Sequence, residues 1–173
     1  MKSINYEGQV MAEHEQEYLT FKLKDEEFGV DILYVQEIRV WSTVTELPNK
    51  PNYFKGVINL RGVIIPVIDL RQRFALEPLE YNAQTVTIIL RSKDKNQVAA
   101  IGIVVDSVSD VYKFDRKSVC PAPEFGCHID SCFLQGLISI DEKLIILLDT
   151  EKLLAQDELY SINEKNKDLE GID

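Results

Sequence analysis

Residues 54–74 and residues 134–154 are two copies of one pattern, and they align without a gap at an offset of 80 residues. Both copies carry the same residue at Gly56/Gly136, Ile58/Ile138, Ile65/Ile145 and Asp69/Asp149, and most of the other apolar positions of one copy are apolar in the other. A duplicated unit is expected to fold in the same way twice. Positions that the copies share are therefore predicted to serve the fold, whereas positions at which they differ are free to serve function.

The duplication extends upstream, because residues 29–38 align with residues 102–111 at an offset of 73. The second copy has thus gained seven residues, and the insertion falls in the segment 120–132. Each copy contains several short alternating segments and one helical turn, which is typical of a small closed or nearly closed β-barrel. A single barrel of this size buries little apolar surface, so we expect the two copies to pack together.

The local patterns predict mainly β structure. Alternation of apolar and polar residues predicts strands over 18–23 and 27–32, hairpins over 54–69, 85–105 and 133–149, and a short helix over 32–38. Arg61 and Gly62 are expected at the turn of the 54–69 hairpin, and Pro66 indicates that its strand is an edge or bulged strand. Asp69 and Asp149 are predicted to cap short helices.

Composition narrows the function classes. The 173 residues are 45% hydrophobic and 28% charged with a net charge of −10, which suits a folded domain and argues against nucleic-acid binding, since no basic stripe is present. The longest apolar run, 98–105, is too short to span a membrane, so we expect no direct membrane insertion and a cytoplasmic protein. Residues 1–16 and 161–173 are predicted to be flexible tails around a domain over 17–160.

Catalytic motifs are absent from the sequence. It contains no phosphate-binding glycine loop, nucleophile elbow or paired histidines on a helix, and we expect neither an enzyme nor a cofactor. The alternative hypothesis is a metal-binding or redox protein, because Cys120, Cys127, His128 and Cys132 are four soft ligands within a short span. Their spacing does not follow the close pairs that are usual in zinc sites, and a loop with small apolar thiols is the simpler interpretation.

The two copies differ most at the hairpin turn. The first copy reads Asn-Leu-Arg-Gly over 59–62, and the second reads Ser-Ile-Asp-Glu over 139–142. Arg61 on a tight turn is most often a solvated charge, but it is also suited to act as a hydrogen-bond fork for a partner protein. Glu37, which aligns with Ser109 or Asp110 of the second copy, is the expected ion-pair partner of Arg61.

Four segments, over 25–38, 54–71, 102–111 and 121–125, resemble the CheW family of bacterial chemotaxis coupling proteins. The match runs from about residue 18 to residue 154 with little insertion. It implies two SH3-like five-stranded β-barrels, intertwined and related by the internal duplication, that pack on a shared core, with short helices and a C-terminal helix. It also implies a non-enzymatic adaptor that links chemoreceptors to the histidine kinase CheA.

The resemblance further implies a groove between the barrels that takes the helical hairpin tip of the receptor. Residues that match the family groove are Val35, Val86, Gly102, Val108 and Val111, flanked by Glu37, Gly56, Arg61 and Gly62. Aliphatic side chains would accept an apolar helical face, although some of these valines are expected to serve the core alone. The regulatory domain of CheA would contact the barrel ends, within arrays built from proteins that are monomers in isolation.

Overall fold

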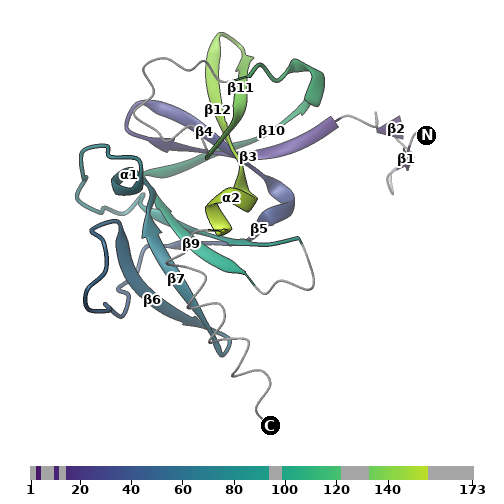
Figure 1. Cartoon of the computed structure of the whole chain (residues 1–173). Coiled ribbons are helices and arrows are strands. Elements are labelled where there is room, and N and C mark those ends of the chain that lie inside the picture. The colour runs from purple at the N-terminus through teal and green to yellow at the C-terminus, as the bar shows by residue number, and fades with distance from the viewer. Residues whose placement is uncertain (1–2, 5–9, 12–14, 94–98, 122–132, 156–173) are drawn as a thin grey trace.

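The computed structural model describes residues 3–4, 10–11, 15–93, 99–121 and 133–155, and within them ten strands form two five-stranded sheets (Figure 1). One sheet has the order β5-β8-β9-β7-β6 and consists of β5 (Val35–Val40), β6 (Phe54–Leu60), β7 (Val63–Asp69), β8 (Val86–Arg91) and β9 (Ala100–Val105). The other has the order β10-β3-β4-β12-β11 and consists of β3 (Glu15–Leu23), β4 (Glu26–Asp31), β10 (Ser107–Asp115), β11 (Leu134–Ile140) and β12 (Lys143–Leu148). We call the first sheet the first barrel and the other the second barrel.

Short elements connect and extend the sheets. Two α-helices follow the repeated hairpins, α1 (Leu70–Arg73) and α2 (Thr150–Leu154), and two 3₁₀ turns precede or follow edge strands, η1 (Ile32–Tyr34) and η2 (Arg116–Ser118). β1 (Ser3–Ile4) and β2 (Val10–Met11) pair with each other inside the segment that was expected to be a tail. Each helix in the described ranges is too short or too polar to cross a bilayer.

The chain exchanges strands between the two barrels. β3 and β4 belong to the second barrel, and the chain then crosses at η1 so that the next three strands enter the first barrel. The second copy does the reverse, since β8 and β9 lie in the first barrel and β10, β11 and β12 lie in the second. Each barrel is therefore built from two strands of one copy and three strands of the other, and Figure 1 shows them as the upper and lower halves of the molecule with α2 between them.

Both sheets close by the same device. Thr45, which follows edge strand β5, forms two backbone hydrogen bonds of 2.9 and 2.8 Å with Val57 on the opposite edge strand β6. Cys120 and Leu137 form the equivalent pair in the second barrel, with both bonds at 2.8 Å. These bridges join the two edges of each sheet, which turns each sheet into a barrel.

The apolar residues form one large core and two small ones. The shared core draws buried side chains from both sheets and both helices, among them Phe21, Phe28, Phe74, Ile88, Ile103, Phe133 and Leu148. Each barrel also has its own interior, centred on Leu60, Ile65 and Ile89 in the first and on Tyr18, Ile138 and Leu147 in the second. The structure thus confirms the predicted fold class of two five-stranded barrels packed on a shared core.

The predicted hairpins and helix caps are also confirmed. The repeated hairpins are β6–β7 and β11–β12, and a helix follows each of them. The side chain of Asp69 accepts a hydrogen bond from Gln72 N at 3.1 Å, and that of Asp149 accepts one from Lys152 N at 3.2 Å. These bonds satisfy backbone donors that the first helical turn leaves free.

Two local predictions are wrong. The segment 32–38 is a helix only as far as Tyr34, and its remainder belongs to β5, in which successive residues alternate between half-buried and exposed. β7 is neither an edge strand nor itself bulged at Pro66, because it lies between β9 and β6, and the register shift falls between Phe54 and Gly56 on β6. Proline is tolerated because the ladder between β7 and β9 begins only at Val67.

Candidate functional site

Edge strand β5 carries aliphatic side chains that extend past the shared core into solvent. A register shift between Val35 and Glu37 places Val35 and Ile38 on the same face of the strand, opposite core residues of β8. Val35 packs against the core, whereas Ile38 is 45% exposed and Val40 is 70% exposed. The row therefore begins in the core and ends as an apolar surface.

Edge strand β10 repeats this arrangement in the second barrel. Val108 lies opposite Phe21 and packs against the shared core, and Val111 lies opposite Leu19 and is 50% exposed. Val86, at the start of β8, also packs half-buried against the shared core. The two edge strands thus present two aliphatic rows, one from each barrel, on the faces that the barrels turn toward their common core.

Two exposed members of these rows, Ile38 and Val40, were not predicted from the sequence as site residues. Ile38 could have been found, because it is the repeat equivalent of Val111, which the family resemblance already assigned to the groove. Val40 carries no such signal, since its equivalent in the second copy is Lys113.

The turn of the β6–β7 hairpin fixes Arg61 at the tip of the first barrel. Arg61 has φ +52° and Gly62 has φ +87°, so both residues adopt the left-handed conformation that suits a two-residue hairpin turn. Asn59 Oδ1 accepts a hydrogen bond from Gly62 N at 2.9 Å, which holds the turn. The Arg61 side chain is 73% exposed.

Arg61 forms an ion pair with Glu37, as the sequence predicted. Arg61 Nη2 lies 3.3 Å from Glu37 Oε2, and Arg39 Nε lies 3.7 Å from the other carboxylate oxygen. The pair joins β5 to the β6–β7 hairpin across the closure of the barrel. The carboxylate of Glu37 orients the guanidinium, while most of the arginine surface stays open to a partner.

Two glycines of the predicted site lie beneath the surface. A Cβ on Gly56, which has φ +147°, would lie 2.2 Å from the carbonyl oxygen of Thr45, so this glycine allows the closing bridge to form. Gly102 is buried in β9, where a Cβ would lie 3.0 Å from Thr87 Cγ2. The Cβ position of Gly102 lies on the opposite face of the sheet from the Val86 side chain, since Gly102 pairs with Ile89. The structure therefore gives both glycines a role in shaping the first barrel.

The cysteine segment lies largely outside the described residues. Cys127, His128 and Cys132 of the proposed ligand set lie outside the described residues. Cys120 is exposed, and its backbone forms the bridge to Leu137 that closes the second barrel. In the described part of the chain, no group of three or more His, Cys, Asp or Glu side chains is arranged to hold a metal.

The comparisons with known proteins agree on one family. A model of the CheW-like domain matches residues 17–158. The chain is 45% identical over 152 residues to a chemotaxis protein CheW of Klebsiella aerogenes, covering 88% of this chain and 89% of that protein. It is 34% identical to a probable chemotaxis protein CheW of Rhizobium etli, covering 90% of this chain and 97% of that protein.

The crystal structure of the scaffolding protein TtCheW from Thermoanaerobacter tengcongensis has the same architecture. It aligns with a TM-score of 0.72 at 31% identity, covering 85% of this chain and 90% of that one. The duplicated barrels, their shared core and these matches together show that the chain belongs to the CheW family of chemotaxis scaffold proteins.

Proposed function

We propose that this chain is a cytoplasmic adaptor that couples the tips of chemoreceptors to the histidine kinase CheA and controls the activity of the kinase. The observation that carries the proposal is the pair of aliphatic rows on β5 and β10, because Ile38, Val40 and Val111 are apolar side chains left in solvent at the edges of both barrels. An amphipathic helical hairpin would bury these side chains, as in other helix-in-groove complexes.

Arg61 and Glu37 support a polar contact at the same site. The ion pair is exposed, so it adds little to folding. A guanidinium held by a carboxylate is already oriented, and it has donors left for the partner. Gly62 beside it has no heavy atom within 4 Å of its Cβ position, which leaves the backbone of the turn open to close approach.

The kinase would contact a different surface, at the far end of the second barrel. A cavity of about 540 Å³ lies between the β3–β4 turn and the β11–β12 hairpin. Leu137, Leu144 and Ile146 line it, and Leu144 is 59% exposed. The remaining lining residues are charged, so the cavity combines an apolar part with a charged rim, and an exposed leucine in such a place is a suitable anchor for a protein interface. The chain would thus present one surface to the receptor and another to the kinase.

Co-sedimentation tests the proposal. Purified protein is mixed with receptor-bearing membranes, with the kinase, or with both. We expect Ile38→Asp to lower binding to the membranes and Leu144→Asp to lower recruitment of the kinase. Leu79→Asp is the matched control, because Leu79 is also 45% exposed but lies in the loop after α1. If Ile38→Asp and Leu79→Asp bind receptor membranes equally well, the assigned receptor surface is wrong.

A further inference from the structure

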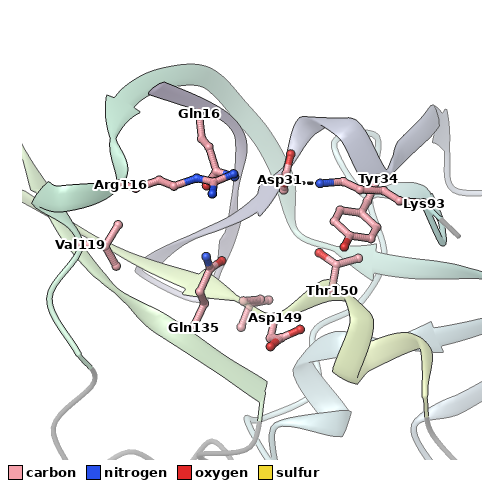
Figure 2. Close-up of a pocket in the computed structure, with 10 residues that line it drawn as sticks. Gln16, Asp31, Tyr34, Lys93, Arg116, Val119, Gln135, Asp149 and Thr150 are labelled. Atoms are coloured by element: carbon pink, nitrogen blue, oxygen red, sulfur yellow. Dashed lines mark hydrogen bonds and ion pairs between the residues drawn. The ribbon is translucent and has the colours of Figure 1, made fainter. Parts of the chain in front are cut away.

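The two barrels differ at their mouths, the ends at which α1 and α2 begin. In the first barrel the cavity at the mouth measures about 10 Å³. In the second barrel it measures about 500 Å³, and Gln16, Asp31, Arg116 and Thr150 are among its lining residues (Figure 2). A cavity of the second size is large enough for a small molecule. The described part of the chain thus fills one mouth and leaves the other hollow.

A tyrosine fills the first mouth. Tyr81 donates a hydrogen bond of 2.6 Å from its hydroxyl to Asp69 Oδ2. Its ring packs against Trp41 with the ring centroids 4.4 Å apart. Burial and the hydrogen bond to the Asp69 carboxylate raise the pKa of Tyr81, so the hydroxyl keeps its proton and acts as a donor. The carboxylate at this mouth therefore has a partner within the chain.

Apolar residues at the first mouth are replaced by polar residues at the second. Trp41 directly follows edge strand β5 and Arg116 directly follows edge strand β10, so these two residues occupy equivalent places. The three replacements at equivalent positions are Leu70 by Thr150, Val104 by Asp31 and Trp41 by Arg116. The fold accepts an apolar residue at each of these positions, so the polar residues of the second mouth are free to serve function.

Thr150 carries a buried hydroxyl that the chain leaves without a partner. The residue is only 4% exposed, and its hydroxyl has no hydrogen-bond partner among the described residues. Figure 2 shows this hydroxyl directed toward the interior of the cavity. An unpaired buried hydroxyl costs free energy, a cost that Leu70 avoids at the equivalent position. The hydroxyl therefore points to a polar group that enters the cavity from outside the chain.

Asp149 places an unpaired negative charge beside this hydroxyl. Within the described ranges its carboxylate accepts the capping bond from Lys152 N at 3.2 Å and belongs to no ion pair. Asp31, on another wall of the cavity, is already neutralised by Lys93, whose Nζ lies 2.9 Å from Asp31 Oδ2. Asp149 is thus the carboxylate that is available to a cationic group.

Arg116 places an unpaired positive charge on the cavity wall. Gln16, with its amide in the orientation that satisfies both partners, accepts hydrogen bonds from Arg116 Nε, at 3.0 Å, and Nη2, and donates to the Tyr18 hydroxyl at 2.9 Å. The buried Tyr18 in turn donates to Gln135 Oε1 at 3.0 Å. No carboxylate of the described residues forms an ion pair with Arg116. The guanidinium is therefore oriented by its neighbours and available to an anionic group.

We propose that the mouth of the second barrel binds a small zwitterionic molecule of the free α-amino acid class. The ammonium group of the ligand faces Asp149, its carboxylate faces Arg116, and the Thr150 hydroxyl forms a hydrogen bond with it. The negative charge of Asp149 disfavours a simple anion, and the positive charge of Arg116 disfavours a simple cation. The inference does not depend on the adaptor function, and it gives the protein a ligand besides its protein partners.

Ligand-detected NMR spectroscopy on the full chain tests the proposal. Saturation transfer is measured to a mixture of free L-amino acids, each at about 1 mM, a concentration at which weak binding is still detected. The same measurement is made with the N-acetylated amino acids, which keep only the carboxylate, and with the amino acid amides, which keep only the ammonium group. We expect transfer to at least one free amino acid and to neither blocked form.

Variants then locate the binding site by titration calorimetry with the amino acid that gives the strongest transfer. Arg116→Gln and Asp149→Asn should each raise its Kd by about tenfold or more, the loss of one charge-assisted hydrogen bond. Asparagine still caps α2, so the second variant keeps the helix. Lys117→Gln is the matched control, because it removes the same charge next to Arg116 but lies outside the cavity lining, and its Kd should be unchanged.

Thr150→Val is the most discriminating variant. Valine has nearly the shape of threonine but no hydroxyl, so the Kd should rise by about fivefold. The variant also removes an unpaired buried hydroxyl, so it should be at least as stable to urea as the unsubstituted protein, and weaker binding cannot then come from unfolding.

Four outcomes would overturn the proposal. The absence of saturation transfer to every free amino acid would show that the class of ligand is wrong, and equal transfer to a blocked form would show that the site does not select a zwitterion. An unchanged Kd for Thr150→Val would place the ligand elsewhere on the protein. A Kd raised equally by Lys117→Gln and Arg116→Gln would reduce the binding to general surface charge.

Discussion

The hairpin turns at the tips of the two barrels share a backbone conformation but carry opposite charges. Arg61 and Gly62 adopt positive φ angles in the first barrel, and Asp141 and Glu142 adopt φ +49° and +66° in the second. The fold thus demands a left-handed two-residue turn at both tips and accepts very different residues there. Charge at the tips is therefore available for function, while the glycines and aspartates that the copies share hold the barrels together.

The largest effect is expected where both copies keep a glycine. Gly56→Ala should destabilise the protein by about 3 kcal/mol or more, because the new Cβ would collide with the Thr45 carbonyl and because φ +147° is unfavourable for alanine. Gly136→Ala should also be strongly destabilising, since its Cβ would lie 2.7 Å from the Cys120 carbonyl oxygen. Urea unfolding of each variant measures these losses.

Gly62→Ala is the control for this comparison. Gly62 also has a positive φ but no heavy atom within 4 Å of its Cβ position, so the cost should be the conformational one alone, about 1 kcal/mol. If Gly62→Ala were as destabilising as Gly56→Ala, close packing at the barrel closure would not be the reason that the copies share a glycine.

The capping aspartates should show a smaller effect, and an unequal one. Asp69→Ala removes a helix cap and the partly buried hydrogen bond from Tyr81, and we expect a loss of about 2–3 kcal/mol. Asp149→Ala removes a more exposed cap and should cost about 1 kcal/mol. Equal losses in urea unfolding would mean that the tyrosine bond adds no stability to the first barrel.

The tyrosines predict a loss of stability at alkaline pH. Burial, together with hydrogen bonds to Asp69 and Glu151 respectively, raises the pKa of Tyr81 and Tyr34 above the ordinary value of 10.0. The unfolded chain therefore releases these protons first as the pH rises. The stabilisation is complete below about pH 10 and is lost progressively above it. Unfolding free energies measured from pH 8 to pH 11 should fall, and Tyr81→Phe should flatten the decline.

The smallest effect on folding is expected at the Arg61 tip. Arg61→Ala removes an ion pair whose arginine is 73% exposed, so the unfolding free energy should change by less than about 1 kcal/mol. Circular dichroism and urea unfolding should match the unsubstituted protein. A large loss would instead make Arg61 part of the scaffold.

The local chemistry of the chain could be predicted from its residues, whereas the intertwining of the barrels was implied only by the family resemblance, and the strand order within each sheet was not predicted. Asp69 and Asp149 were predicted as caps, and Glu37 was predicted to pair with Arg61, because repeat position and turn geometry are local signals. The exchange of strands between the barrels leaves no local signature, since every strand keeps its own pattern whichever sheet it joins.

The error in β5 has a specific physical cause. The register shift at Gln36 places Val35 and Ile38 on one face at a spacing of three residues, which imitates the period of a helix. The same irregularity lies between Val108 and Val111 in β10. Both bulges occur in the edge strands that carry the candidate site. The register shift that made β5 look helical in the sequence is therefore also the irregularity that places the aliphatic side chains of each row on one face.

Binding to receptor-bearing membranes, measured by co-sedimentation without the kinase, tests most directly whether the differences between the copies carry the function. Arg61→Ala should require about fivefold or more protein for half-maximal binding, in keeping with coupling energies of about 1–3 kcal/mol at signalling interfaces. Asp141→Ala, at the equivalent turn of the second barrel, should bind as the unsubstituted protein does. Unchanged binding by a correctly folded Arg61→Ala variant, or an equal loss in both variants, would contradict the account.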